Sequence, residues 1–315
     1  MPYEQTSSLD RLIQSDEPVR LVSFSADGQT LAGACRDGKV RLWETASGKL
    51  LRTVALGPED RRSITLPPGA RWVAAAGPDK VIKIWSLANG ELLHRLAGHT
   101  QPTGALAFSR DGKMLASSSA GERAVRLWDL ESAKQRFILP DGFGGAANLV
   151  FSPDGELLVG ANYDTNLRVW STRTGALLRT IEDLLVSIFA SSFSPDGIYL
   201  ACAGVDRTVY VWNTRNWTVT RKLTGQPEMI SAMTFSPDGR LLVTGGTDAS
   251  SFQNPAKILV WEMGSGTVLR TLSTAHGVTS IAMSPDSRVV AFADARNAIT
   301  LASVPEAGIS KAITQ

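Results

Sequence analysis

The stretch Phe235-Ser236-Pro237-Asp238-Gly239 is one of seven similar phrases in a chain of 315 residues. Successive phrases start 42 or 43 residues apart, except for a last interval of 48 residues. A fixed period in a sequence indicates a repeated structural unit, so seven equivalent units are expected. The phrases begin at Phe24, Leu66, Phe108, Phe151, Phe193, Phe235 and Met283.

A second mark follows each phrase by 19 or 20 residues, or by 26 in copy six, where a short aliphatic run ends in Trp in every copy but the last. Between the marks, the first copy has four short segments separated by Gly, Asp and Ser. Asp and Ser bond to nearby backbone in turns, and Gly accepts a positive φ. Each copy is therefore predicted to be a four-stranded antiparallel meander. The first copy's strands are expected at Val19–Phe24, Thr30–Cys35, Val40–Trp43 and Leu50–Val54.

The recurring aromatic residue explains how such small sheets could be stabilised. A sheet of four short strands cannot cover both of its faces, whereas a neighbouring copy stacked on it can. A Trp at that contact can bury ~150–250 Å², and closing the stack into a ring leaves only short, protected edges. The fold class is thus predicted to be all-β, a seven-bladed β-propeller of four-stranded antiparallel blades, with residues 1–315 as a single domain. The marks are Trp43, Trp85, Trp128, Trp170, Trp212, Trp261 and, in the last copy, Ala302.

The repeats resemble those of WD-repeat β-propellers over nearly the whole chain. The Trp-Asp pair occurs at Trp128-Asp129 and the family's Gly-His pair at Gly98-His99, while Ser117 and Thr244 carry the second-strand hydroxyl. The resemblance implies a Trp–Ser/Thr–His–Asp hydrogen-bond chain in each blade. The Gly-His pair appears once, in the third copy, which has Gly121-Glu122 where the family has its turn Asp, so the chain is predicted to be complete in no blade. The family's turn aspartate is present as Asp37, Asp79, Asp164, Asp206 and Asp248.

Two segments could supply the fourth strand of the last blade. Arg11-Leu12 lies as far before Phe24 as Arg95-Leu96 lies before Phe108. In the family that the chain resembles, an N-terminal segment commonly completes the last blade. Residues about 9–13 are therefore predicted to close the ring, and residues 309–313 are the alternative.

Composition narrows the choice of function classes. The net charge is +2, from 32 basic and 30 acidic residues, which is too balanced to indicate nucleic acid as the main partner. Residues 1–20 contain no apolar run, so no signal peptide is expected, and no stretch approaches the roughly 20 apolar residues of a membrane span. Cys35 and Cys202 fall in distant copies, so free thiols and a cytoplasmic location are expected.

Catalytic motifs are not recognisable. His94, His99 and His276 do not lie at metal-ligand spacing from one another or from a Cys. Residues 33–40 nearly match a phosphate-binding loop, but Val40 replaces the Ser or Thr that would hold Mg²⁺, and no helix is expected to follow. The recurring Asp residues fit turns better than acid–base work. The chain is expected not to be an enzyme and to use no metal or cofactor.

Departures from the repeat indicate where a partner could bind. The largest is in copy six, where the turn gains seven residues and carries Phe252. Leu184 and Leu185 are apolar where other copies have Gly, Pro or charge, and several rim arginines offer bidentate forks to carboxylates. The candidate partner-binding residues are Arg61, Arg62, Arg123, Phe143, Tyr163, Leu185, Arg207, Phe252 and Arg296.

Together these patterns favour a non-catalytic protein–protein interaction scaffold. Its rim loops would present a surface to a protein or peptide partner, and any effector would be supplied by another chain. The propeller itself is expected to be monomeric, with no membrane partner. The alternatives are a nucleic-acid-associated propeller that uses the rim arginines and, less favoured by the sequence, an enzymatic propeller.

Overall fold

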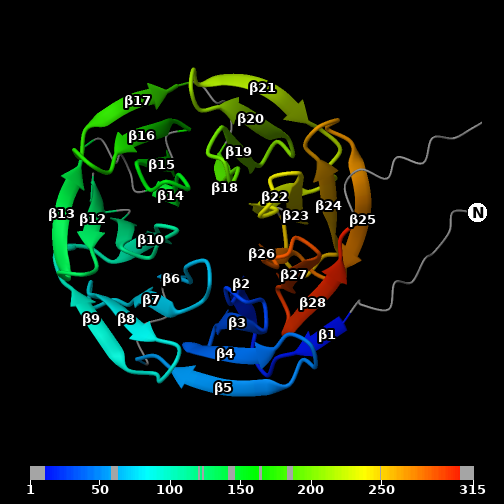
Figure 1. Cartoon of the computed structure of the whole chain (residues 1–315), viewed down its shortest axis with the longest axis horizontal. Helices are drawn as coiled ribbons and strands as arrows, with labels where there is room; N and C mark the ends of the chain where they lie inside the picture. The colour runs from blue at the N-terminus through cyan, green and yellow to red at the C-terminus, as the bar shows by residue number, and fades with distance from the viewer. Residues whose placement is uncertain are drawn as a thin grey trace, which may run out of the picture.

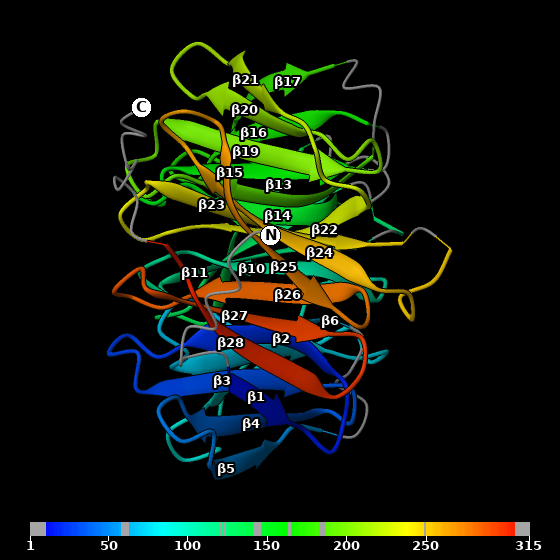
Figure 2. The ribbon, with the colours of Figure 1, turned by 90° about the vertical axis from the view of Figure 1, so that its right-hand side faces the viewer.

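The computed structural model describes residues 11–57, 63–119, 121–122, 124–140, 146–162, 165–182, 187–248 and 250–305. In these residues, 28 strands form seven four-stranded antiparallel sheets around a central channel (Figure 1). Seen from the side, the sheets stack around the ring like blades (Figure 2). The predicted fold class, a seven-bladed propeller of four-stranded blades, is confirmed.

The first strand of each blade lines the channel and the fourth lies at the outer edge (Figure 1). Blade 1 consists of β2 (Val19–Phe24), β3 (Thr30–Cys35), β4 (Lys39–Glu44) and β5 (Leu50–Ala55). Blade 2 consists of β6 (Ser63–Thr65), β7 (Trp72–Ala76), β8 (Ile82–Ser86) and β9 (Leu92–Leu96). Blade 3 consists of β10 (Thr103–Phe108), β11 (Met114–Ser119), β12 (Val125–Asp129) and β13 (Lys134–Leu139). Blade 4 consists of β14 (Ala146–Phe151), β15 (Leu157–Asn162), β16 (Leu167–Ser171) and β17 (Leu177–Ile181).

The remaining blades follow the same order. Blade 5 consists of β18 (Ile188–Phe193), β19 (Tyr199–Gly204), β20 (Val209–Asn213) and β21 (Thr218–Leu223). Blade 6 consists of β22 (Met229–Phe235), β23 (Leu241–Thr247), β24 (Ala256–Glu262) and β25 (Val268–Thr274). Blade 7 consists of β26 (Val278–Met283), β27 (Val289–Asp294), β28 (Ala298–Ser303) and β1 (Arg11–Gln14).

The ring has two rims. We call the rim with the Ser-Pro-Asp-Gly turns the turn rim; it includes residues 109–113, 236–240 and 263–266. The opposite rim, the loop rim, carries the connections between blades and the turns between second and third strands, such as residues 15–18 and 248–255. Each rim is built from chain segments that lie far apart in sequence.

The repeated phrase builds the turns of the turn rim by local hydrogen bonds. In blade 6, the Ser236 hydroxyl donates to the Asp238 carboxylate over 2.5 Å, and the backbone N–H of Arg240 donates to the same oxygen over 3.0 Å. Gly239 adopts a φ of 73°, which an L side chain rarely does. The phrase therefore specifies a tight turn between the first two strands and needs no further role.

The hydrophobic core is divided into seven clusters, one at each contact between blades. Trp43 of blade 1 packs with Ala291 and Leu301 of blade 7, and Trp128 packs with residues of blade 2 such as Ile84. Each of the six Trp residues thus fills the contact with the preceding blade. This stacking role is the one that the repeat predicts.

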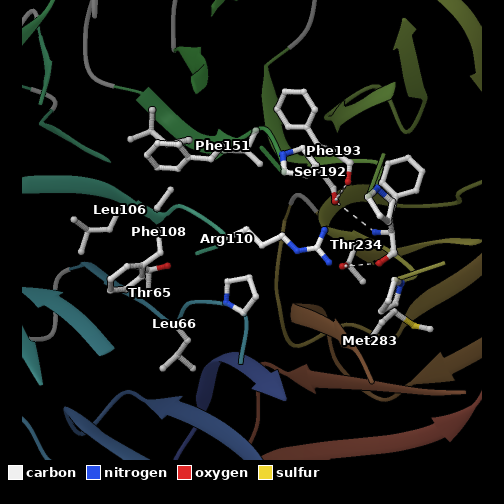
Figure 3. A pocket seen from close by; sticks show the side chains of 18 residues that line it. Thr65, Leu66, Leu106, Phe108, Arg110, Phe151, Ser192, Phe193, Thr234 and Met283 are labelled. Carbon is white, nitrogen blue, oxygen red and sulfur yellow. Dashed lines mark hydrogen bonds between the residues drawn. The ribbon is translucent and has the colours of Figure 1, made fainter. Parts of the chain in front are cut away.

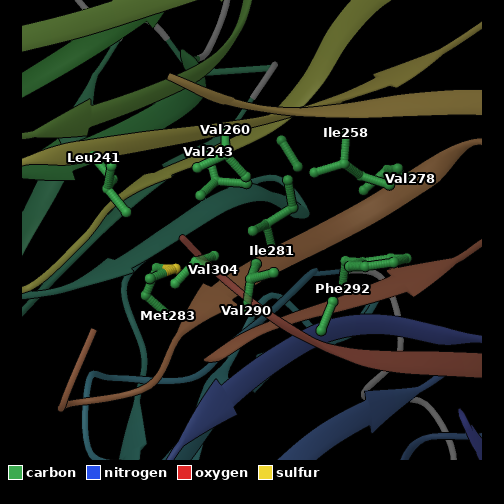
Figure 4. Packing of buried hydrophobic residues seen from close by; sticks show 12 residues of the cluster. Leu241, Val243, Ile258, Val260, Val278, Ile281, Met283, Val290, Phe292 and Val304 are labelled. Carbon is green, nitrogen blue, oxygen red and sulfur yellow. The ribbon is translucent and has the colours of Figure 1, made fainter. Parts of the chain in front are cut away.

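Blade 7 fills its contact with blade 6 in a different way (Figure 4). Ala302 is 1% exposed at the Trp position, and Phe292 on the neighbouring strand β27 is 3% exposed in the same cluster. In blade 1, Gly33 holds the repeat position of Phe292, and a Cβ there would lie 2.6 Å from the Trp43 ring. In blade 1 the large residue of the pair is the Trp on the third strand, and its neighbour on the second strand is a Gly. In blade 7 the sizes are reversed, with Ala302 on the third strand and Phe292 on the second. One large aromatic residue therefore still faces the preceding blade.

Strand β1 lies beside β28 and supplies the outer strand of blade 7 (Figure 1). The pairing is antiparallel, from Arg11 opposite Leu301 to Gln14 opposite Ala298. Ile13 is 3% exposed and packs in the cluster that joins blades 7 and 1. The alternative segment, residues 309–313, lies outside the described residues.

We expect Ile13→Ala to lower the free energy of unfolding by ~2 kcal/mol, because it removes a buried aliphatic side chain from the closing strand. Deletion of residues 1–14 should destabilise further, since it also leaves β28 without its outer neighbour. Urea unfolding checks both, with Leu12→Ala as the matched control because Leu12 is 56% exposed on the same strand. An unchanged midpoint after the deletion would rule out a closing role for β1.

Candidate functional site

A hydrogen-bond network under the loop rim of blade 3 corrects the sequence prediction that no such chain is complete. The Trp128 indole N–H donates to the Ser117 hydroxyl over 2.7 Å, and this hydroxyl lies 2.7 Å from Nε2 of His99. Nδ1 of His99 lies 2.9 Å from the Glu122 carboxylate. The turn of this blade is one residue longer than in blade 1, and the longer Glu reaches from the shifted position.

Charge and burial fix the protonation of this network. Burial tends to raise the pKa of Glu122, but hydrogen bonds from the Thr100 backbone and hydroxyl, and from His99, outweigh it and lower the pKa to about 2. Burial lowers the pKa of His99 by more than Glu122 raises it, so the imidazole is neutral at pH 7. A neutral His99 that donates from Nδ1 accepts the Ser117 hydroxyl at Nε2, which satisfies every group in the chain.

Blade 6 contains a second version of the network. The Trp261 indole N–H donates to the Thr244 hydroxyl over 2.9 Å, and Thr244 donates to the side-chain oxygen of Gln226 over 2.9 Å. The amide group of Gln226 then donates to the backbone carbonyl of Lys257 over 2.9 Å. Gln226 follows Gly225 as His99 follows Gly98, so an amide replaces the imidazole.

The turn aspartates of blades 1, 2 and 5 also have structural partners. Asp37 accepts from the guanidinium of Arg41 over 2.9 Å, and Asp79 lies 2.9 Å from the ammonium of Lys83. Asp206 accepts from the Tyr210 hydroxyl over 2.7 Å. In each case the partner lies four residues later on the third strand, so these acids brace turns.

A cavity of about 600 Å³ opens at the mouth of the channel on the loop rim. Blades 1, 5, 6 and 7 contribute its walls. Its apolar side chains include Phe189, Met229 and Phe252, and its charged side chains are Arg20 and Arg36. Phe189 is 36% exposed and Phe252 is 46% exposed, so both rings are open to a ligand. The cavity thus combines an apolar wall with a basic wall.

The inserted loop of blade 6 is held in place by hydrogen bonds to its own blade and to blade 7. The backbone N–H of Gly277 donates to the carbonyl of Phe252 over 2.8 Å, and the Asn254 amide donates to the Asp248 carboxylate over 2.8 Å. Nδ1 of His276 lies 2.9 Å from the carbonyl of Gln253. These contacts position the Phe252 ring at the cavity without requiring a bound partner.

The basic wall lies on blade 1. Arg20 is half-buried at the start of β2, and Arg36 is exposed in the turn after β3. Burial, and then repulsion by Arg36, lower the pKa of Arg20, although the guanidinium stays charged at pH 7. Among the described residues that line the cavity, these two arginines are the only ionisable ones, so the wall is suited to an anionic group.

The structure describes three of the nine candidate partner-binding residues. Phe252 lines the cavity, and the guanidinium of Arg296 donates to the Gln253 side chain over 2.8 Å, beside Phe252. Arg207 lies apart in blade 5, exposed, with its guanidinium 3.2 Å from the carbonyl of Pro227. The candidates outside the described residues are Arg61, Arg62, Arg123, Phe143, Tyr163 and Leu185.

Arg20, Phe189 and Met229 were not among the candidates that the sequence indicated. The repeat pattern could have indicated two of these residues, Arg20 and Phe189. Arg20 and Phe189 each lie four residues before the aromatic residue that begins their phrase, a position held by Ser231 and Thr279 in blades 6 and 7. This repeat position faces the cavity in all four of these blades, so comparing its residue type between copies would have indicated which side chains lie at the channel mouth.

A second cavity, of about 390 Å³, lies in the channel near the turn rim. Arg110 reaches into it from the turn between β10 and β11, toward Ser192 and Thr234 on the far side (Figure 3). Arg110 stands where five other copies have Pro, and it is exposed to solvent. Aromatic and aliphatic ends of the first strands form most of the wall.

The described ranges contain no group of three or more His, Cys, Asp or Glu residues placed to hold a metal ion. They also contain no helix of the length and hydrophobicity required to cross a membrane. Cys35 and Cys202 are both buried and unpaired.

The stacked four-stranded blades and their Trp–hydroxyl networks define a repeat β-propeller of the WD type. Comparison with known proteins agrees. A model of the WD domain, G-beta repeat, matches residues 90–129, 144–171, 178–213 and 217–250, and a model of the Anaphase-promoting complex subunit 4 WD40 domain matches residues 11–67. The chain belongs to the WD-repeat β-propeller family.

Relatives come from distant organisms. The chain is 30% identical to Periodic tryptophan protein 2 of Arabidopsis thaliana over 52% of its own length and 18% of that relative. It is 26% identical to an uncharacterized WD repeat-containing protein of Synechocystis over 45% of its length and 40% of the relative. It is 25% identical to Cell division cycle 20.1, cofactor of APC complex, of Arabidopsis thaliana over 56% of its length and 41% of the relative. The matches thus cover less than half of these relatives.

Proposed function

We propose that this chain is a non-catalytic recognition subunit that binds a segment of a protein partner in the loop-rim cavity. The observation that carries the proposal is the tethered insertion of blade 6, which holds the exposed Phe252 ring over the cavity. Aromatic residues and Arg are the commonest interface hot spots, and this cavity presents both. The name of one relative, a cofactor of the APC complex, is consistent with a role inside an assembly.

The chemistry of the cavity defines the partner segment. An apolar side chain would contact Phe189, Met229 and Phe252, and an acidic group next to it would pair with Arg20 and Arg36. An acid would also relieve the repulsion that lowers the pKa of Arg20. The effector would be supplied by another chain, and the buried thiols of Cys35 and Cys202 suit a complex in the cytoplasm.

Selection of random peptides displayed on phage tests this proposal. Selected peptides should share an acidic residue beside an aromatic or large aliphatic one. Phe252→Ala should weaken their binding about tenfold, as expected for an aromatic hot spot, and Arg36→Glu should reverse the preference for acids. Isothermal titration measures both effects.

Val205→Ala is the matched control, because Val205 is 44% exposed on a loop-rim turn of blade 5 and does not line the cavity. The affinity of the Val205→Ala variant for the selected peptides should stay within about twofold of that of the unsubstituted protein. Peptides without the shared pattern, or peptides that bind the Phe252→Ala variant equally well, would show that the cavity is not the recognition site. Binding of DNA in place of peptides, lost steeply with salt, would favour the nucleic-acid alternative.

A further inference from the structure

One position on the outer strands carries a side chain that bonds to the next blade, near the turn rim, in blades 5 and 6. It lies nine residues after the Trp of each blade. Four blades carry Arg there, blade 3 carries Phe137, and blade 2 carries His94. Arg221 and Arg270 are half-buried and bind the next blade, whereas Arg52 and Arg179 are exposed. The four arginines are Arg52, Arg179, Arg221 and Arg270.

Blades 5 and 6 show what the arginine does. The Arg221 guanidinium donates to the backbone carbonyls of Met263 and Gly264 in the next blade, over 3.0 Å for Gly264. The Arg270 guanidinium likewise donates to the backbone carbonyl and hydroxyl of Ser303, over 3.0 Å for the hydroxyl. Both side chains are half-buried, so each fills the groove between two blades and binds the carbonyls at its far wall.

Blade 3 fills the same groove with an aromatic ring instead. Phe137 packs so closely against Gly175 of blade 4 that a Cβ at Gly175 would lie 2.8 Å from the ring. In blade 2, by contrast, His94 is shorter than Arg. A cavity of about 450 Å³ remains between blades 2 and 3, and His94 is part of its wall.

The far wall of this open groove has backbone carbonyls at the same repeat positions as those that bind Arg221 between blades 5 and 6. Leu130 and Glu131 line the cavity, and they lie two and three residues after Trp128, as Met263 and Gly264 do after Trp261. Their carbonyls thus hold the repeat positions of the carbonyls that accept from Arg221. Glu131 adds an exposed carboxylate that Gly264 lacks.

The near wall adds an aromatic surface. Trp72 begins β7, where the other copies have no Trp, and its ring lies against the turn at Gly112, so that a Cβ on Gly112 would be 2.5 Å away. A guanidinium stacks well on a Trp ring. Ile84 and Leu93 provide apolar walls for the methylene groups of a long side chain.

A lysine and a histidine also line this site. Lys113 lies at the edge of the cavity with its side chain exposed, and His94 is half-buried on the outer strand. Lys113 is free to extend into water, whereas the carbonyls and the Trp72 ring are fixed. The fixed groups match the planar, multiply donating guanidinium better than the compact ammonium of lysine.

We propose that the groove between blades 2 and 3 binds an arginine side chain of a partner protein. The partner's arginine takes the place that Arg221 and Arg270 occupy in their own grooves, with its methylene groups along Leu93 and its guanidinium at Leu130 and Glu131. This site lies near the turn rim, opposite the loop-rim cavity, and does not depend on it. The chain thereby offers two separate contacts to an assembly.

Titration with N-acetyl-arginine amide, followed by NMR of the isotope-labelled protein, tests the site directly. N-acetyl-citrulline amide, which has the same shape without the charge, should bind at least about tenfold more weakly. Glu131→Gln should weaken the arginine derivative about threefold, and the indole signal of Trp72 should shift on binding.

His94→Arg provides the decisive variant, because its own guanidinium can reach the carbonyls of Leu130 and Glu131 as Arg221 does in blade 5. We expect it to raise the melting temperature and to weaken the arginine derivative at least about tenfold. Leu178→Arg, which adds the same charge on the exposed outer strand of blade 4, is the matched control and should change neither.

Equal binding of the arginine and citrulline derivatives would overturn the proposal, as would undiminished binding to a folded His94→Arg variant. If His94→Arg does not fold, His94→Phe fills the groove as Phe137 does in blade 3 and carries the same expectation. Binding that Glu131→Gln and both His94 variants leave unchanged would place the ligand elsewhere on the protein.

Discussion

Replacing Phe292 with Ala should lower the free energy of unfolding by ~3–5 kcal/mol, which is the usual cost of truncating a buried Phe. Phe292 is 3% exposed and packs against blade 6, where Ala302 is too small to fill the contact by itself. Chemical unfolding in urea measures the change. A loss below about 1 kcal/mol would mean that the cluster collapses around the gap or that Phe292 does not fill it.

The exchange of aromatic positions makes a sharper prediction. Ala302→Trp alone should destabilise blade 7, because the new ring would overlap Phe292 as a Cβ on Gly33 would overlap Trp43. Phe292→Gly combined with Ala302→Trp restores the arrangement of blade 1 and should cost much less than the sum of the single changes. A double-mutant cycle measures the coupling, for which we expect at least about 2 kcal/mol. If the effects of the two substitutions on the free energy of unfolding simply add, Phe292 does not fill the space that Trp fills in the other blades.

Glu122→Ala should lower the free energy of unfolding by ~3 kcal/mol, because it leaves buried donors without their acceptor. The backbone N–H and hydroxyl of Thr100, Nδ1 of His99 and the guanidinium of Arg126 all point to this carboxylate. Glu156→Ala is a suitable control, since Glu156 is an exposed acid on the turn rim of blade 4. Equal effects of the two substitutions would show that the network adds no stability.

The same network makes stability depend on pH with a definite sign. The folded state lowers the pKa of His99 from 6.5 and that of Glu122 from 4.5 to about 2, so the unfolded chain binds protons more readily at both groups. Stability should therefore fall as the pH drops below about 6.5, first through His99 and then, from about 4.5 to 2, through Glu122. In Glu122→Gln, the second part of this loss should be smaller. An identical pH profile for the two proteins would refute the assignment.

The architecture was predictable from sequence because the physical reasons for it recur in every copy. Ser-Pro-Asp-Gly phrases such as the one at Phe235 specify turns by contacts within five residues, and a Trp in six copies marks the stacking position. The blade 3 network was missed because its acid is shifted by one residue and lengthened to Glu122. The compensation of Ala302 by Phe292 was missed because it becomes visible only when strands are placed in register.

The candidate site was only partly predictable. Phe252 could be named because an insertion breaks the period, whereas Arg20 and Phe189 sit at regular positions and differ only in residue type. Whether an insertion is held or free depends on side-chain contacts such as that between Arg296 and Gln253, which sequence spacing does not encode. The groove beside His94 became recognisable only once Arg221 showed what fills it elsewhere.

The Ala302–Phe292 exchange also determines where this gene can recombine. A crossover between whole blades always delivers one large aromatic residue to each contact, whichever strand carries it. A crossover between the second and third strands of blade 7 and another blade would pair Phe292 with a Trp, or Ala302 with a smaller residue such as Gly or Ser. One chimera would be overfilled and the other hollow. The second and third strands of a blade must therefore be inherited together, and shuffling libraries should place no junction between them.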